Sequence, residues 1–192
     1  QGWRNDQTGR LVQAWWLLPL VTAETPRGYL QLVIASANIR FGDCSADIVL
    51  ATSRDGVRWN EPTRIPTGPF EGFYFLPALA VDPATSGTKA RLALLYHSMS
   101  PSVVCDPTAG CLGIDVRMVT STNGGRSWTA PRRLNAFSMP PFWMADTSLG
   151  RMLGDYVSVS WSRGRPIAVF SLAFEPIDDL YRQSIFATTR LR

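Results

Sequence analysis

Short runs of alternating apolar and polar residues recur along the chain, separated by turn-forming residues. Residues 157–161 read Val-Ser-Val-Ser-Trp, and a period of two is typical of a half-buried β-strand. The 15 glycines and 14 prolines are spread along the sequence and leave few long stretches that favour a helix. We therefore expect an all-β protein, with strands near residues 11–17, 29–35, 76–81, 91–97, 115–121, 127–134, 155–161 and 167–172.

An internal repeat is the strongest pattern in the sequence. The segments Ala51-Thr52-Ser53, Val119-Thr120-Ser121 and Ala187-Thr188-Thr189 are separated by 68 residues in both intervals, and each follows a β-like run. Asp47 and Asp115 occupy equivalent positions before the first two segments. A fixed period of this length indicates a structural unit that is repeated along the chain.

The first two segments continue into similar turns. Residues 53–59 read Ser-Arg-Asp-Gly-Val-Arg-Trp, and residues 121–128 read Ser-Thr-Asn-Gly-Gly-Arg-Ser-Trp. Each turn is expected to join two strands of a hairpin. Its Asp or Asn would cap the turn amides, its glycine would adopt a positive φ, and its tryptophan would pack back beneath the turn.

These turns resemble the Asp box, S-x-D-x-G-x-x-W, of bacterial neuraminidase (sialidase) repeats. The matching residues are Ser53, Asp55, Gly56 and Trp59 in the first copy, and Ser121, Asn123, Gly125 and Trp128 in the second. The first copy is one residue shorter than the pattern, and the second has Asn in place of Asp. The resemblance implies a β-propeller made of four-stranded blades.

About three blades are expected, at residues 1–66, 67–135 and 136–192. A closed propeller usually has roughly 4–8 blades. The expectation is therefore that this chain is part of a longer protein, or that two copies pair to close a six-bladed ring. The partners expected within the fold are accordingly the remaining blades or a second copy.

The resemblance also implies where a ligand would bind. In sialidase-type propellers the Asp boxes lie on the face opposite the active site, so they are structural and not catalytic. The ligand face would collect the other loops, which are expected at residues 36–46, 67–75, 98–114, 135–154 and 174–183. Loops held by a rigid scaffold are where binding residues concentrate.

Enzymes of the sialidase type use a tyrosine nucleophile assisted by a carboxylate, a separate Asp acid/base, and arginines that grip the sugar carboxylate. By this resemblance the catalytic candidates are Asp155, Tyr156 and Glu71, and the substrate-binding candidates are Arg151, Arg40, Tyr74 and Trp143. Arg64, which Arg133 repeats, is expected on an outer strand. A complete arginine triad is therefore not assigned.

Plainer interpretations exist for the same residues. Tyr156 would also suit a core position between blades, Asp155 a turn at a strand entrance, and Glu71 a solvated loop. Adjacent strand residues point to opposite faces, so at most one of Asp155 and Tyr156 would face the channel. His97, which ends an apolar strand, is interpreted as a hydrogen-bonded core histidine in preference to a general base.

Charge, hydrophobic runs and cysteine content limit the kinds of partner and ligand that are expected. The net charge of +4 comes almost wholly from scattered arginines, with Lys89 the only lysine, which argues against nucleic acid as a partner. No apolar run reaches the roughly 18 residues of a membrane span. Cys105 and Cys111 bracket a turn and could close as a disulfide in an oxidising compartment, whereas a metal site is not expected with only one histidine.

Three functions follow as hypotheses. The first is a sialidase-like glycoside hydrolase of the exo-α-sialidase type, or a fragment of one, which acts on extracellular glycans without a cofactor. It would be secreted or extracytoplasmic, with a glycan or glycoconjugate as its partner. The second is a non-catalytic Asp-box propeller that binds carbohydrate or protein, and the third is a half-ring that serves assembly. Asp boxes specify a fold and not a chemistry, so the sequence does not choose among them.

Overall fold

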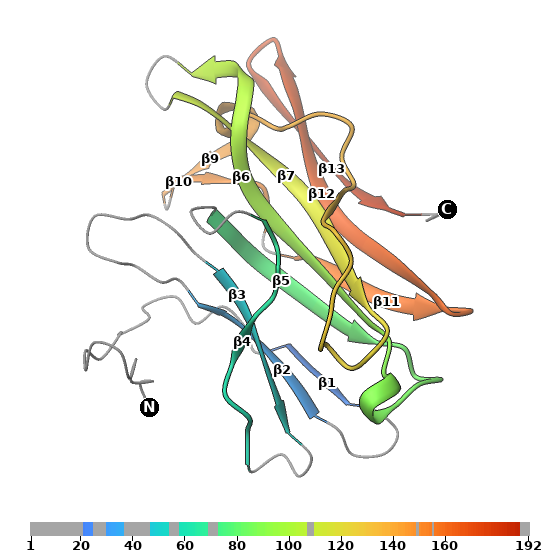
Figure 1. The fold of residues 1–192 in the computed structure, drawn as a ribbon. Helices are drawn as coiled ribbons and strands as arrows, with labels where there is room; N and C mark the ends of the chain where they lie inside the picture. Colours follow the sequence, from blue (N-terminus) through green and yellow to red (C-terminus); the bar gives the residue numbers. More distant parts are fainter. Residues whose placement is uncertain are drawn as a thin grey trace, which may run out of the picture.

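The protein folds into consecutive antiparallel sheets in the computed structural model (Figure 1). The structure describes residues 21–24, 30–36, 47–53, 58–68, 73–106, 110–148, 150–154 and 156–188. The first sheet contains β1 (Val21–Glu24), β2 (Leu30–Ser36), β3 (Asp47–Ser53) and β4 (Thr63–Arg64), and the second contains β5 (Phe73–Val81), β6 (Leu92–Asp106), β7 (Gly110–Ser121) and β8 (Arg132–Arg133). The third sheet contains β11 (Ser158–Ser162), β12 (Arg165–Ile177) and β13 (Leu180–Ala187).

Each sheet is an up-and-down meander in which strands adjacent in sequence are hydrogen-bonded neighbours. Between the second and third sheets lie the short 3₁₀ helix η2 (Pro141–Trp143) and a small hairpin of β9 (Ala145–Thr147) and β10 (Gly150–Met152). A second 3₁₀ helix, η1 (Gly87–Lys89), connects β5 to β6. The prediction of an all-β protein is confirmed.

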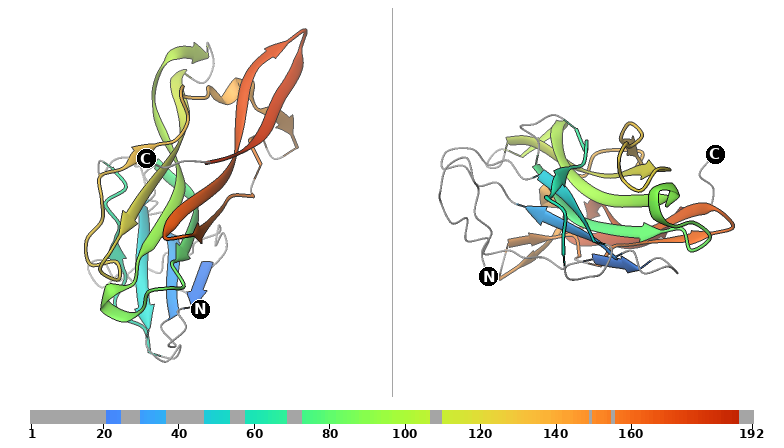
Figure 2. Two further views of the ribbon diagram at one scale, coloured as in Figure 1. Left: turned by 90° about the vertical axis from the view of Figure 1, so that its right-hand side faces the viewer. Right: turned by 60° about the horizontal axis from the view of Figure 1, so that its bottom comes forward.

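The first strands of the three sheets lie side by side. β5 packs against β1 on one side and against β11 on the other, as Figures 1 and 2 also show. Meanders whose first strands follow one another around an axis are the blades of a β-propeller. We therefore call the three sheets the first, second and third blade.

The strand β6 is buried on both faces, because it lies in the middle of the second blade. Leu92, Leu94 and Tyr96 belong to the apolar cluster shared with the first blade. The alternate residues Ala93 and Leu95 belong to the cluster shared with the third blade. Side chains of a strand alternate between the two faces of its sheet, so a nearly continuous apolar run is what a strand between two blade interfaces requires.

Two predicted loops are wrong, because the strands around them are longer than expected. In place of a loop at residues 98–114, β6 continues to Asp106 and pairs with β7 from Gly110. In place of a loop at 174–183, β12 and β13 form a hairpin in which Ile177 pairs with Leu180. The two turn residues, Asp178 and Asp179, both have positive φ (51° and 61°), which is the requirement of a type I′ hairpin turn.

Other strand predictions shift at their ends. The strand predicted at 127–134 is only the two-residue β8, and the one predicted at 155–161 begins later, as β11. The strand predicted at 11–17 lies outside the described residues, and β1 is the described strand that precedes β2. The backbones of Cys105 and Cys111 lie on β6 and β7, while their side chains are outside the described part.

The turn at residues 121–128 is held by its own side chains. The Ser121 hydroxyl oxygen accepts hydrogen bonds from the amides of Asn123 (3.3 Å) and Gly125 (2.9 Å). The Asn123 side-chain oxygen accepts one from the Ser127 amide at 2.9 Å, and the Trp128 indole N–H donates to the Gly125 carbonyl oxygen at 3.0 Å. The side chains of Ser121, Asn123 and Trp128 therefore find partners within the turn, while the Gly124 amide donates to the Ala90 carbonyl oxygen of the preceding connection at 2.9 Å.

Gly125 is one of two adjacent glycines of this turn that have a positive φ and no room for a side chain; the other is Gly124. Gly125 has φ +88°, and a Cβ atom there would collide with the Leu50 side chain of the first blade. Trp128 packs against the same interface between the first and second blades. In the first copy, Ser53 forms a β-bridge with Trp59, while Asp55 and Gly56 lie outside the described residues.

An ion pair recurs at equivalent positions of the two blades. Asp47 on β3 binds Arg64 on β4 with an N–O distance of 2.8 Å. Asp115 on β7 lies 3.7 Å from Arg133 on β8 and 2.8 Å from Arg117. Arg64 is thus an outer-strand residue, as the repeat predicted, and its guanidinium fastens the short outer strand to its neighbour.

Candidate functional site

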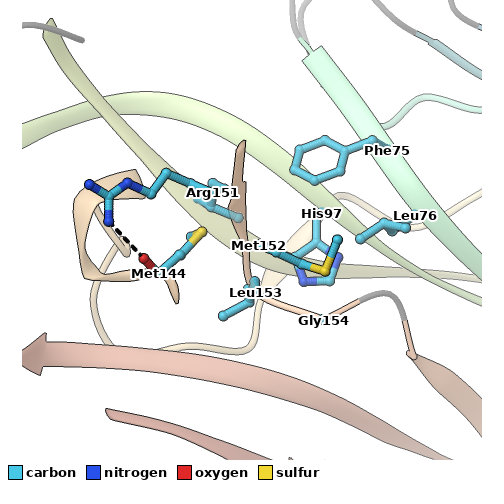
Figure 3. Close-up of a pocket in the computed structure, with 9 residues that line it drawn as sticks. Phe75, Leu76, His97, Met144, Arg151, Met152, Leu153 and Gly154 are labelled. Atoms are coloured by element: carbon cyan, nitrogen blue, oxygen red, sulfur yellow. Dashed lines mark hydrogen bonds between the residues drawn. The ribbon is translucent and has the colours of Figure 1, made fainter. Parts of the chain in front are cut away.

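A cavity of about 200 Å³ lies between the second and third blades (Figure 3). Its walls come from β5, β6 and β7 of the second blade and from the segment that leads to β11. The lining residues are Phe75, Leu76, His97, Ile114, Met144, Arg151, Met152, Leu153 and Gly154. Because His97 pairs with Val116 while Leu92 pairs with Ser121, the cavity is displaced along β6 away from the 121–128 turn. This is the side on which the ligand face was expected.

His97 is the buried polar residue among those that line the cavity. Its side chain is 1% exposed, and neither ring nitrogen has a hydrogen-bond partner among the described residues. The imidazole stacks on the Phe75 ring with 5.5 Å between centroids and 28° between planes. Burial disfavours the charged form and lowers the pKa of His97 to about 4. The prediction of a hydrogen-bonded core histidine is therefore half right, since the residue is buried but unpartnered.

A backbone irregularity shapes the wall beside His97. The pairing of β5 with β6 changes register between Phe75 and Ala78. Within this bulge Leu76 has φ +49°, an uncommon conformation for a residue with a side chain. Bulges re-aim side chains and are frequent next to binding sites, and here the bulge places Leu76 on the cavity wall.

Arg151 lies at the exposed end of the cavity, on the β9–β10 hairpin. Its Nη1 group donates hydrogen bonds to the Tyr181 hydroxyl at 2.6 Å and to the Met144 carbonyl oxygen at 3.2 Å. The Asp146 carboxylate is 3.9 Å from Nε. Figure 3 shows the guanidinium directed toward Met144 and away from His97. Arg151 therefore ties the hairpin to β13 while its own charge stays near solvent.

Tyr156 is 93% exposed and lies two residues before β11, the first strand of the third blade. The alternative interpretation of Tyr156 as a core aromatic is therefore wrong. Its neighbour Asp155, the other residue of the predicted catalytic pair, lies outside the described residues, as do Glu71 and Arg40. The structure thus places one of the three catalytic candidates, and it places that one in solvent.

The two remaining binding candidates lie elsewhere. Tyr74 is only 4% exposed, and its ring meets Tyr96 edge-on at 6.0 Å in the interface between the first and second blades. Burial raises the pKa of Tyr74. Trp143 is half-buried on η2, where its ring lies 5.9 Å from Phe137. Neither side chain lines the cavity, so Arg151 is the predicted binding residue that the structure brings to it.

Sequence reasoning did not find the cavity itself. His97 was noted as the only histidine, but its neighbours across the cavity, Met144, Met152 and Leu153, looked like ordinary loop and core residues. The signal available in the sequence was a histidine within an apolar strand, where an unpaired imidazole is costly. Among the described residues no helix is long and apolar enough to cross a membrane, and no group of three or more His, Cys, Asp or Glu side chains could hold a metal ion.

Comparison with known proteins bears on the fold. No protein-family model and no curated protein matches the sequence. A solved structure, the Hadza microbial sialidase Hz136, is similar with a TM-score of 0.52 and 15% sequence identity. The match covers 88% of this chain but 34% of the sialidase chain, so this chain spans about a third of that protein.

These observations define the fold of the chain as a partial β-propeller with about three blades. Its particular likeness is to the fold of a microbial sialidase. At 15% identity this likeness concerns the course of the backbone and does not extend to the chemistry.

Proposed function

We propose that this chain is part of a sialidase-like glycoside hydrolase of the exo-α-sialidase type, secreted or extracytoplasmic, that acts on extracellular glycans. The observation that carries the proposal is the position of Tyr156. In a chain with a sialidase-like fold, this tyrosine is 93% exposed and lies two residues before β11, the first strand of the third blade. A nucleophile must be reachable by substrate, whereas most tyrosines that begin a core strand are not.

The roles of the chain's residues follow from the resemblance to sialidases. The Tyr156 hydroxyl would attack the anomeric carbon, with Glu71 as the carboxylate that takes its proton. Because β11 begins only at Ser158, the alternation of side chains along a strand does not apply at Tyr156, and Asp155 would protonate the departing glycosidic oxygen and afterwards activate water. Arg151, five residues before Tyr156, would attract a sugar carboxylate toward this segment through charge-assisted hydrogen bonds.

Turnover of a fluorogenic sialoside tests this function. The protein that contains this chain is expected to release the fluorophore, and Tyr156→Phe is expected to lower kcat by about 10³-fold or more, because the covalent step is lost. Ile185→Ala removes another strongly exposed side chain (76%) that has no role in the proposed site and is the control, with an expected change of less than about tenfold. Absence of turnover in the unaltered protein, or equal losses in the two variants, would exclude the proposal.

A specific observation favours a second candidate, a non-catalytic propeller that binds carbohydrate or protein. Trp143 meets Phe137 at 5.9 Å and Phe142 at 6.4 Å, so aromatic rings gather on η2 beside the cavity. Aromatic clusters of this kind suit the apolar faces of sugars. Glycan-array binding that survives Tyr156→Phe and is lost in Trp143→Ala, without turnover of any sialoside, would establish this alternative.

A further inference from the structure

The β9–β10 hairpin carries Arg151 on a very short piece of structure. Each of its strands has three residues, and none of the six is buried. Isolated two-stranded hairpins are marginally stable at best in water. The buried residues Met144 and Leu153 fix the two ends of the hairpin in the core, but they do not fix the strands between them. The direction of the Arg151 side chain therefore depends on contacts made by other parts of the fold.

Two side chains of β13 supply these contacts. The Tyr181 hydroxyl oxygen accepts a hydrogen bond from Arg151 Nη1 at 2.6 Å. Gln183 Nε2 donates one to the Met152 carbonyl oxygen at 2.9 Å. The Tyr181 ring also lies 5.7 Å from the guanidinium carbon, which is a cation–π contact. Because residues two apart on a strand point to the same face, β13 holds two successive residues of β10 at once and fixes the orientation of β10 as well as its position.

The strand β13 is itself held by its neighbour β12. Gln183 pairs with Ala173, which is fully buried. Nearer the turn the register shifts, so that two residues of β12 lie opposite Tyr181 alone. A bulge of this kind re-aims side chains, and here it lies at the residue that contacts Arg151. Tyr181 and Gln183 therefore act from a strand that is anchored in the core.

The contacts to Arg151 leave its positive charge available. Its Nη1 group binds two neutral oxygens, those of the Tyr181 hydroxyl and the Met144 carbonyl. The Asp146 carboxylate is 3.9 Å from Nε and its side chain is 64% exposed, so this ion pair is weak and screened by water. The arrangement thus orients a guanidinium without neutralising it, which suits a site for the carboxylate of a ligand.

We propose that Tyr181 and Gln183 are positioning residues that hold Arg151 in the orientation required to bind a ligand carboxylate. This role rests on the proposed function, in which Arg151 attracts a sugar carboxylate. Tyr181 and Gln183 act on the ligand through Arg151 and β10. Their loss should therefore weaken the binding of ligands that carry a carboxylate and leave the binding of neutral analogues unaffected.

Hydrogen exchange followed by mass spectrometry tests the contacts without a ligand. Tyr181→Phe keeps the ring but removes the acceptor, and Gln183→Leu removes the donor. In the protein that contains this chain, either change is expected to speed amide exchange in residues 144–153 about fivefold, because one hydrogen bond is lost. Ile185→Ala, at a strongly exposed position of the same strand, is the matched control and leaves the exchange unchanged. Equal exchange in the two variants and the control overturns the proposal.

Binding of free sialic acid and of its methyl ester tests the role in recognition. The ester lacks the negative charge, so the ratio of the two dissociation constants, ester to acid, measures what the Arg151 charge contributes. This ratio is expected to fall about tenfold in Tyr181→Phe, because an oriented charge-assisted hydrogen bond is lost, and to stay the same in Ile185→Ala. An equal loss of affinity for both ligands would mean that Tyr181 only stabilises the fold, and would contradict the proposal.

Neither measurement depends on turnover. Binding that shows the Tyr181→Phe effect, without hydrolysis of any sialoside, would exclude the hydrolase and keep the positioning role. Hydrolysis by a protein whose ester-to-acid ratio is the same in Tyr181→Phe would do the opposite. No measurable binding of the acid by the unaltered protein also overturns the positioning role.

Discussion

The 121–128 turn and the cavity wall at His97 both belong to the second blade, but they differ in whether their polar groups are hydrogen-bonded. At the 121–128 turn, Ser121, Asn123 and Trp128 all have hydrogen-bond partners within the turn itself. At the cavity, His97 is more deeply buried than Asn123 or Trp128, yet its ring nitrogens have no partner among the described residues. The buried ring of His97 therefore costs stability that the turn does not lose. A fold tolerates such a cost at sites that serve binding more readily than at sites that only connect strands.

A side chain added at Gly125 should lower the free energy of unfolding more than the other changes described below. Gly125→Val is expected to destabilise the protein by about 4 kcal/mol, because a positive φ strains a side chain and the new atoms overpack the interface. Gly150→Ala is the matched control. Gly150 also has a positive φ (+103°), but nothing lies within 4 Å of a Cβ there, so the expected cost is about 1 kcal/mol. Urea denaturation measures both, and equal losses would contradict the role assigned to Leu50.

The cavity should make stability depend on pH. The pKa of His97 is about 4 in the folded protein against 6.5 in the unfolded chain. Between these values the unfolded chain binds the proton and the folded protein does not, so stability falls as the pH falls from 6.5 to 4. The expected loss is about 3 kcal/mol.

Comparison of the protein with His97→Leu over this pH range isolates the effect, since both share the same carboxyl groups. The difference in unfolding free energy between them should change by about 3 kcal/mol from pH 6.5 to pH 4. Parallel curves would mean that the imidazole is solvated or partnered in the folded state.

Loss of the hydrogen bond that Asn123 accepts in the turn should have the smallest effect on the free energy of unfolding. Asn123→Leu removes the acceptor of the Ser127 amide and is expected to cost about 1 kcal/mol in thermal or urea unfolding. Asn123→Asp keeps this acceptor, and its second oxygen can accept from the Ser127 hydroxyl, so the expected change is near zero. A loss in Asn123→Asp as large as that in Asn123→Leu would show that the amide nitrogen, and not the oxygen, holds the turn.

The contrast also explains what the sequence could reveal. The turn and the central strands were predictable because their determinants are local, such as the spacing of Ser121, Asn123 and Trp128 and the alternation along β6. The hairpin at Asp178 and Asp179 was missed, although two aspartates between apolar runs are compatible with positive φ.

The cavity was not predictable for a different reason. It depends on a register shift at Leu76 and on the approach of residues 144–154 to His97, and neither is encoded in a local pattern. Tyr74 and Trp143 were chosen for their residue type within loops, and that type does not tell which face of a blade a side chain meets. Arg151 was chosen because the resemblance to sialidases calls for arginines near the catalytic tyrosine, and it precedes Tyr156 by five residues.

The double-sided burial of β6 has a consequence for how the molecule unfolds. Its odd and even residues belong to different blade interfaces, so neither interface can open without exposing one face of the same strand. In repeat architectures stability is shared between units and their nearest-neighbour contacts. The three blades should therefore lose structure as one cooperative unit.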